Sequence, residues 1–558
     1  MISNYNTSMK DIKIVAPVKK PDDIEVFAKN TDCRDYYVYH KRFINNNFDY
    51  VKDFVDKAKE NNCRIFINFK HDITEENLPE IKKLLKYLKT AGIDGIYINC
   101  YAILEAIKLF NLPFKVIADS YFDIHNLAGI DFINNFHKVD EIIITEEIYM
   151  KNIEKIKKYT KLPLSIDTDN LPYFAEELKK SGAIDKVVIK GKFETAEDIL
   201  EAIELVQKIL DKPKLFKKQK LPFKHVRKCI YQTNHFSGDM ISADGKDFKF
   251  KRNIETFEWN IQRAKINTDV NIEKARKYRI NLRLSELAQI KELEKYIKKI
   301  GNNPVYSIEY GEILSTKDLV TSSFCEIITK VKKFCKKYGI KFQLSTPRIL
   351  IERDFDRVYE YGKQLMLNGS EPDSIIFNNI GYFWTFINDN DINHIPIEIG
   401  QGINLLNSLS IKCLNNLAPV QTVDFTAFGD IELAILTAKK LKNIIMNKKY
   451  TIAGNIRVPS MGLCPLNNDS AIISRLSCAA PCHKGGYALK DPSLNKIFPF
   501  TCDGFCRMHM FEDRILEDFS VVDELFEVGI NEFTFDFSAL NAKYIPILLE
   551  KFLTSADI

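Results

Sequence analysis

The sequence predicts an α/β protein built from two tandem (β/α) barrel-like halves. Three observations support this fold class: short apolar runs alternate with amphipathic stretches, the alternation repeats about eight times within roughly 200 residues, and the two halves end alike. Strands of about five residues that alternate with helices of ten or more residues are typical of βα units and a parallel sheet. Eight such units favour a closed barrel over an open sheet.

The first half, residues 1–213, provides these elements in chain order. Each expected strand is a short run rich in Ile, Val and Phe, and each expected helix has apolar residues at helical spacing. The strands are expected at 11–18, 63–69, 95–99, 114–120, 141–145, 162–167 and 186–191, and helices at 22–30, 76–92, 100–111 and 194–210.

The second half, residues 276–558, repeats the arrangement. It starts with a strand and a long helix at 278–299, and its ending at 522–552 aligns with residues 175–206: each has an acidic helix, a glycine, a strand and a closing helix. We interpret the halves as two copies of one unit, joined by a basic and polar connector at 214–275. The further strands are expected at 304–310, 340–346, 374–379, 395–402, 420–426 and 450–456.

The composition is that of a globular protein, with 45% hydrophobic and 28% charged residues in 558. No stretch reaches the roughly 18 apolar residues of a membrane helix, and the N-terminus lacks the pattern of a secretory signal. We therefore expect a cytoplasmic protein that does not enter a membrane. In that compartment stable disulfides are disfavoured, so clustered cysteines favour metal binding or redox chemistry.

Residues 212–228 form a basic run without an acidic residue, although the net charge of the whole chain is only +5. Such a run could follow the phosphate backbone of RNA, whereas a solvated linker between domains is the more common reading. Its basic residues are Lys212, Lys214, Lys217, Lys218, Lys220, Lys224, Arg227 and Lys228.

Five of the 12 cysteines lie within the 43 residues from Cys464 to Cys506, where an even spread would place about one. The others in this cluster are Cys478, Cys482 and Cys502. Four converging thiolates suit zinc or an iron–sulfur cluster. Two CxxxC pairs favour a zinc ribbon, whereas a long-range arm through the first cysteine favours an iron–sulfur cluster, and both remain open. The CxxxCxxC pattern of radical S-adenosylmethionine enzymes is absent.

The cysteine cluster follows an expected late strand of the second half, whereas the first half has only scattered cysteines. Barrel enzymes carry their chemistry at the C-terminal ends of the strands. The second half is therefore expected to be the active one. A nucleophilic cysteine assisted by His483 or His509 is a further alternative, while the remaining cysteines, such as Cys63 and Cys413, fit buried thiols.

The cluster and its surroundings resemble the peptidase U32 family, also called collagenase-like proteins. The matching features are a Cys-Pro at Cys464, the CxxxC pair, "ALKD" at 488–491, and "FPFTCDGFCRM" with Arg507. Outside the cluster, residues 11–30 and 186–203 resemble the opening and closing of the family's barrel, with Lys192 in place of an arginine. The strand end at 400–408 is similar to a family motif with two asparagines, which Asn404 and Asn407 match. The corresponding segment of the first half retains only Asn126.

The resemblance implies an iron–sulfur protein that supports hydroxylation without dioxygen. Substrates in the family include RNA bases and a ubiquinone precursor ring, prephenate can supply the oxygen, and some members act as pairs of related chains. By this resemblance Cys464, Cys478, Cys482 and Cys506 hold a 4Fe-4S cluster, with Cys502 as the substitute for Cys506.

The sequence departs from the family pattern at two arginine positions. The closing Gly-Arg is replaced in the second half by Asp536-Phe537-Ser538, and Tyr-Gly-Arg before the first cysteine is reduced to Ile456-Arg457. Arg457 and Arg507 are our candidates for binding a carboxylate through two hydrogen bonds. For each of them, a surface ion pair is an equally good explanation. Asp424 is a candidate for proton transfer, and it and Asp430 otherwise suit helix capping.

These observations lead to one preferred function and two alternatives. The preferred function is oxygen-independent hydroxylation, or a related modification, of an RNA base or small aromatic ring by an iron–sulfur enzyme. The first alternative is a non-catalytic, cluster-bearing partner of a related chain. The second is a cysteine- or metal-dependent peptidase, as the family name suggests.

Overall fold

The computed structural model divides the chain into two compact units, Met1–Lys249 and Phe250–Ile558. We describe each unit separately. The described residues are 11–43, 48–69, 73–122, 124–136, 139–144, 150–168, 171–191, 193–213, 254–259, 270–461, 486–491, 495–505 and 507–555.

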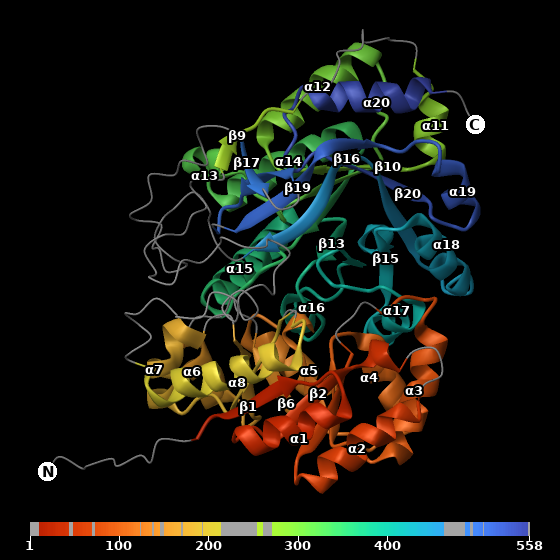
Figure 1. Cartoon of the computed structure of the whole chain (residues 1–558). Helices are drawn as coiled ribbons and strands as arrows, with labels where there is room; N and C mark the ends of the chain where they lie inside the picture. Colours follow the sequence, from red (N-terminus) through yellow and green to blue (C-terminus); the bar gives the residue numbers. More distant parts are fainter. Residues whose placement is uncertain are drawn as a thin grey trace, which may run out of the picture. The chain divides into compact units, whose positions relative to one another are not determined.

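The first unit contains a closed barrel of eight parallel strands in the order β1 to β8, with helices between them (Figure 1). Strand β1 closes the ring by pairing with both β2 and β8. The strands are β1 (Lys13–Pro17), β2 (Asp35–Tyr39), β3 (Arg64–Asn68), β4 (Gly95–Ile98), β5 (Val116–Ala118), β6 (Glu141–Ile144), β7 (Leu164–Asp167) and β8 (Lys186–Val188). The helices are α1 (Pro21–Asn30), α2 (Tyr50–Glu60), α3 (Leu78–Ala91), α4 (Tyr101–Phe110), α5 (Leu127–Phe136), α6 (Met150–Tyr159), α7 (Leu171–Ser181) and α8 (Ala196–Asp211).

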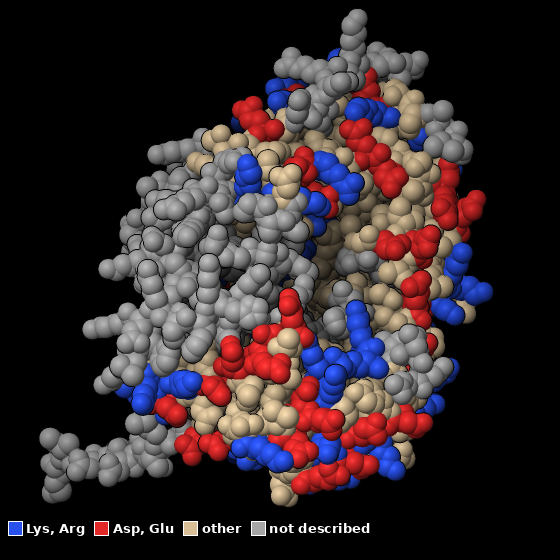
Figure 2. Space-filling view, in the orientation of Figure 1, with Lys and Arg blue, Asp and Glu red and all other residues tan. Residues whose placement is uncertain are grey.

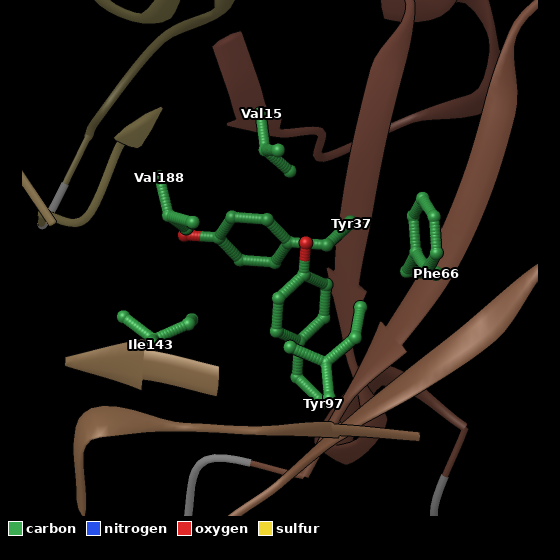
Figure 3. Packing of buried hydrophobic residues seen from close by; sticks show 7 residues of the cluster. Val15, Tyr37, Phe66, Tyr97, Ile143 and Val188 are labelled. Atoms are coloured by element: carbon green, nitrogen blue, oxygen red, sulfur yellow. The ribbon is translucent and has the colours of Figure 1, made fainter. Parts of the chain in front are cut away.

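The centre of this barrel is apolar and aromatic. Side chains alternate between the lumen and the helices along each strand, and those at the centre of the lumen form one fully buried cluster (Figure 3). Tyr37 reaches across the lumen and donates a hydrogen bond to the carbonyl oxygen of Ile189. The cluster consists of Val15, Tyr37, Phe66, Tyr97, Ile117, Ile143 and Val188.

Below this cluster, toward the N-terminal ends of the strands, lies a buried ionic network. Glu141 accepts hydrogen bonds from Lys186 at 2.6 Å and from Ser165 at 2.6 Å. Asp35 accepts two hydrogen bonds from Arg64, at 2.7 and 2.5 Å. Burial lowers the pKa of Lys186, although Glu141 opposes this effect. The aromatic cluster therefore separates this network from the C-terminal end of the barrel.

Two tyrosines of this cluster provide a matched test of its hydrogen bonding. Tyr37 has a carbonyl acceptor, whereas the hydroxyl of Tyr97 is buried and lacks a hydrogen-bond partner among the described residues. We expect Tyr37→Phe to destabilise the first unit by about 1 kcal/mol and Tyr97→Phe to be neutral or slightly stabilising. Thermal unfolding followed by circular dichroism checks this difference, and equal shifts for the two variants would contradict it.

The second unit also contains a closed barrel of eight parallel strands (Figure 1). Its ring runs β10–β11–β12–β13–β14–β15–β16–β20 and closes between β20 and β10. The strands are β10 (Ile280–Leu284), β11 (Ser307–Tyr310), β12 (Lys341–Ser345), β13 (Ser374–Phe377), β14 (Ile397–Ile399), β15 (Val420–Asp424), β16 (Asn447–Met461) and β20 (Glu532–Asp536). The helices are α11 (Ile272–Lys277), α12 (Leu287–Ile300), α13 (Thr316–Thr321), α14 (Phe324–Tyr338), α15 (Glu352–Leu365), α16 (Ile380–Ile387), α17 (Ser408–Asn415), α18 (Ile431–Lys440), α19 (Val522–Glu527) and α20 (Tyr544–Thr554). The two predicted barrels are thus confirmed, while the predicted connector boundaries stay predictions.

Helix α14 illustrates how local sequence sets these elements. The hydroxyl of Ser323 accepts a hydrogen bond from the backbone of Glu326, whose carboxylate accepts one from the backbone of Ser323. This capping box satisfies two N–H groups at the start of the helix. Gly339 ends the helix in the left-handed region, with φ of 65°. The helix therefore begins and ends where its own residues satisfy the backbone.

Strand β16 belongs to two sheets at once. Its first part pairs with β15 and β20 in the barrel, and its last part pairs antiparallel with β19 (Met508–Glu517). The antiparallel sheet continues through β18 (Lys496–Cys502) and β17 (Tyr487–Asp491) to β9 (Ile254–Thr256). Figure 1 shows β16 and β19 running side by side. This sheet places the described part of the cysteine-rich region next to the end of β16.

Candidate functional site

The lumen of the second barrel is polar along its length, unlike that of the first. Its inward side chains bond to one another across neighbouring strands, and nearly all are buried. Parallel strands that are buried on both faces are normally apolar throughout, so this lumen is exceptional. The bonded lumen residues are Asn281, Arg283, Ser307, Glu309, Gln343, Ser374, Glu398, Asp424, Lys449, Thr534 and Asp536.

Lys449 and Glu398 form an ion pair within this lumen. The ammonium group lies 2.9 Å from the Glu398 carboxylate and 3.2 Å from the amide oxygen of Gln343. Burial raises the pKa of the nearby Glu532 to about 7, because desolvation outweighs the attraction of Lys449. This region therefore holds a carboxyl group that is poised to change its charge near neutral pH.

Arg283 is the centre of a second network, closer to the C-terminal ends of the strands. Its guanidinium nitrogens lie 2.8 Å from Glu309, 2.8 Å from Asp424 and 3.0 Å from Asp536. These carboxylates come from β11, β15 and β20, so one arginine connects strands across the barrel. The arginine side chain is only 4% exposed, and an ionised group at this depth depends on its partners.

Arg457 extends this network beyond the barrel. It donates to Asp536 at 2.8 Å, to Glu312 at 2.6 Å and to the hydroxyl of Ser538 at 2.8 Å. Arg348 lies 3.4 Å from Glu312. We call the resulting cluster the charged mouth: Arg283, Glu309, Glu312, Arg348, Asp424, Arg457 and Asp536.

The neighbouring arginines lower the pKa of two carboxyl groups of the charged mouth, Glu312 and Asp536. Burial opposes ionisation of Glu312, but Arg457 and Arg348 outweigh it and lower its pKa to about 2. Arg457 and Arg283 do the same for Asp536, whose pKa is also lowered to about 2. The three arginines of the charged mouth thus face four carboxylates, and their positive charge is already balanced by protein groups.

The structure unites two of the predicted site residues and places the third elsewhere. Asp424 and Arg457 belong to the same network, because Arg283 and Asp536 connect them. Arg507 instead lies 3.1 Å from Asp354 at the start of α15. Asp424 also caps a turn by accepting from the backbone of Thr426.

A hydrogen-bonded chain connects Ser460 of β16 and His509 of β19 to Asp503, which directly follows β18. One ring nitrogen of His509 lies 3.0 Å from the Ser460 hydroxyl and the other lies 3.1 Å from the Asp503 carboxylate. Asp503 also accepts from the backbone of Phe505 and Arg507. Both nitrogens of His509 therefore contact oxygen atoms of described residues.

Of the five clustered cysteines, the structure describes Cys502, which is buried at the end of β18. Cys502 pairs in register with Met508, and Met508 pairs with Met461 at the end of β16. Cys464, Cys478, Cys482 and Cys506 lie outside the described residues. Within the described ranges, no group of three or more His, Cys, Asp or Glu side chains is arranged to hold a metal ion.

Several other predicted residues have local structural roles. Asp430 caps the start of α18, Asn407 caps α17, and Asn126 accepts from the backbone of Gly129 near the start of α5. Asn404 is exposed. Lys192 lies outside the described residues, as does the basic run apart from Lys212 and Pro213.

On the face drawn in Figure 2, the described residues expose both acidic and basic side chains. In the portion of the chain that the structure describes, no helix is long and apolar enough to span a membrane.

Sequence reasoning missed the residues at the centre of the charged mouth: Arg283, Glu309, Glu312 and Asp536. A signal for them was present, because "INLRL", "SIEY", "KFQLS" and "EFTFD" alternate apolar and polar residues. In a parallel barrel covered by helices, such alternation indicates a polar lumen. Glu312, which follows β11, has no comparable signal.

Comparisons with known proteins identify a family for part of the chain. No curated protein matches the sequence. Among solved structures, the YdjI aldolase from Escherichia coli K12 is 14% identical over 37% of this chain and 83% of its own, with a TM-score of 0.25. The phospho-2-dehydro-3-deoxyheptonate aldolase from Thermotoga maritima is 13% identical over 37% of this chain and 69% of its own, with a TM-score of 0.28. Similarities this low carry no argument about activity.

The match to a family model is located in the first unit. It covers residues 35–170, from β2 to just beyond β7, whereas the cysteine motif belongs to the second unit. The chain therefore contains a domain of peptidase family U32.

Proposed function

We propose that this chain is an iron–sulfur enzyme that hydroxylates, or otherwise modifies, an RNA base or small aromatic ring without dioxygen. The proposal rests on the U32 domain, on the cysteine motif, and on the charged mouth at the C-terminal ends of the second barrel's strands. Closed parallel barrels carry their active sites at that end. A related U32-type chain is a proposed partner, and RNA is proposed to bind through the basic run at 212–228.

The observation that carries the proposal is the strand register beside the charged mouth. Pairing of β16 with β19 and of β19 with β18 brings Met461, Met508 and Cys502 to one end of the antiparallel sheet. In the sequence, Cys464 follows Met461 by three residues, and Cys506 directly precedes Arg507. Described residues that are close in sequence to three proposed ligands therefore lie at one end of this sheet, and β16 also carries Arg457.

Cys502, the described cysteine at this place, suits the proposed iron–sulfur cluster. Thiolates are its usual ligands, and Cys502 is only 4% exposed, as suits a site that must be shielded from water. A bound cluster would supply electron transfer. The protein's own contribution is to fix Asp536 and Glu312 through Arg457 and to keep the region dry.

The charge balance of the charged mouth favours an uncharged ring as substrate. Arg283 and Arg457 are already paired with carboxylates, so an incoming anion would meet carboxylates as well as guanidinium groups. A neutral base offers hydrogen-bonding edges without that repulsion. Asp424 is proposed to exchange a proton with the bound ring.

Iron analysis of protein purified without oxygen tests the proposal. We expect about four irons and four sulfides per chain, with the matching visible and paramagnetic resonance spectra, and loss of both in Cys478→Ala. The control is Cys325→Ala, a half-buried thiol at the start of α14, which should retain the iron. A colourless protein, or one that holds a single zinc, would refute the iron–sulfur enzyme.

A second measurement separates the enzyme from a non-catalytic partner. Iron-loaded protein that modifies a base or ring when given a reductant and an oxygen donor would support the enzyme. Activity that depends wholly on a second, related chain, with no effect of Asp424→Asn, would identify a cluster-bearing partner instead.

A further inference from the structure

The C-terminal face of the first barrel carries a ring of polar side chains. Strand alternation places them toward the lumen, because Tyr37, Phe66 and Val188 of the central cluster stand two residues before Tyr39, Asn68 and Lys190. Each lies at the end of a strand or within two residues of it. We call this ring the polar face: Tyr39, Asn68, Asn99, Asp119, Asp167 and Lys190.

The polar face is separate from the ionic network at the other end of the same barrel. The aromatic cluster between them is fully buried (Figure 3). Two charged zones are therefore built into one lumen. The lower zone has the internal ion pairs of a structural network, whereas the polar face occupies the end at which parallel barrels bind ligands.

Lys190 organises the polar face. Its ammonium group donates to Asp119 at 2.8 Å and to the hydroxyl of Ser120 at 2.6 Å, and lies 3.9 Å from Asp167. The Lys190 side chain is 2% exposed. Tyr39 is within electrostatic range of this group, since Lys190 lowers its pKa, while burial, the larger effect, raises it.

Within the polar face, Asn68 carries a hydrogen-bond acceptor that is unsatisfied by the described residues. The residue is 1% exposed, and its side-chain oxygen receives no hydrogen bond from any described residue. It pairs in register with Tyr39 on the neighbouring strand, so it lies in the polar face itself. A buried acceptor without a donor costs about 1–3 kcal/mol in general, and an O–H or N–H group of a ligand would satisfy it.

The charges of the polar face define the chemistry of that ligand. Two carboxylates surround one ammonium group, so a phosphate or carboxylate would be repelled. Carboxylates and amides bind hydroxyl groups well, because they accept from an O–H and the amide also donates to the oxygen. Tyr39 adds a half-buried aromatic ring.

We propose that the polar face of the first barrel binds a small uncharged polyol with adjacent hydroxyl groups, either a free sugar or the ribose of a nucleoside. Asn68 accepts from one hydroxyl, and Asp167 accepts from its neighbour. This site does not depend on iron, and it gives a binding role to the half of the chain that lacks the cysteine cluster.

Binding of D-ribose, uridine and D-ribose 5-phosphate to the full chain tests the proposal, measured by ligand-observed NMR and titration calorimetry. We expect ribose or uridine to bind, and ribose 5-phosphate to bind at least tenfold more weakly than ribose. Uridine binding without ribose binding would identify a nucleoside site, and equal binding of the two would identify a sugar site. Absence of binding by both, or equal binding of the phosphate, would overturn the proposal.

Asn68→Ala locates the site. We expect it to weaken binding at least tenfold, whereas Asn30→Ala, the same change at an exposed helix end, should leave binding unchanged. Asp167→Asn, which retains the shape, should also weaken binding, and thermal unfolding verifies that each variant folds. Unchanged affinity in folded Asn68→Ala would place the ligand elsewhere and refute the polar face as its site.

Discussion

Replacement of Arg283 by methionine is expected to destabilise the second unit by about 3–5 kcal/mol. The substitution removes the single group that lies within 3.0 Å of Glu309, Asp424 and Asp536. Methionine fills a similar volume but leaves these buried carboxylates without their shared counter-charge, and each must then be neutralised or hydrated. The loss therefore reflects uncompensated charge more than lost packing.

Urea unfolding followed by tryptophan fluorescence measures this loss. Both tryptophans, Trp259 and Trp384, belong to the second unit, so the signal reports on that unit. Arg276→Met is the matched control, because Arg276 is 66% exposed and pairs only with Glu273 among the described residues. It should cost less than about 1 kcal/mol. An unchanged urea midpoint in Arg283→Met would show that the charged mouth does not stabilise the barrel.

Replacement of Gly454 by alanine is expected to cost the second unit about 3 kcal/mol or more, through backbone strain and steric overlap. Gly454 lies in β16 with φ of 96°, and a Cβ atom there would come within 2.1 Å of the carbonyl oxygen of Asp536. Strands β16 and β20 would have to separate. Because Asp536 binds both Arg283 and Arg457, the charged mouth would be disturbed as well.

Gly339→Ala separates the two contributions in the same fluorescence measurement. Gly339 also has a positive φ, of 65°, but no atom lies within 4 Å of its hypothetical Cβ. It should therefore show the cost of the left-handed conformation alone, about 1 kcal/mol. Equal losses for the two variants would mean that the close approach of β16 to β20 is unimportant.

The fold was largely predictable because most of its helices and strands have a recognisable local sequence pattern. Residues 95–98 and 141–144 are short apolar runs, and they form β4 and β6. Helix α8 has a capping box at Thr195 and an apolar face, and its observed start at Ala196 follows from that sequence. Strand β9 was not predictable, because its three residues gain their structure from pairing with β17, more than 200 residues away.

The candidate site was less predictable, because it depends on pairings between distant strands. Asp424 was identified from its position at a strand end and Arg457 from the family resemblance. Arg283, the residue that joins them, precedes both by more than 130 residues. The sequence marks Arg283 as polar within an apolar strand, but it does not name its partners. Arg507 shows the same limit, since its partner Asp354 lies in a helix with no motif.

The continuity of β16 has a mechanical consequence. One unbroken strand of 15 residues is hydrogen-bonded to the barrel at one end and to the antiparallel sheet at the other, so neither sheet can tilt without straining the other. The four residue steps from Arg457 to Met461 correspond to at most about 13 Å of extended chain. The strand therefore sets the distance between Arg457 and the start of the cysteine-rich region at Met461. A reaction between two groups requires such defined positions.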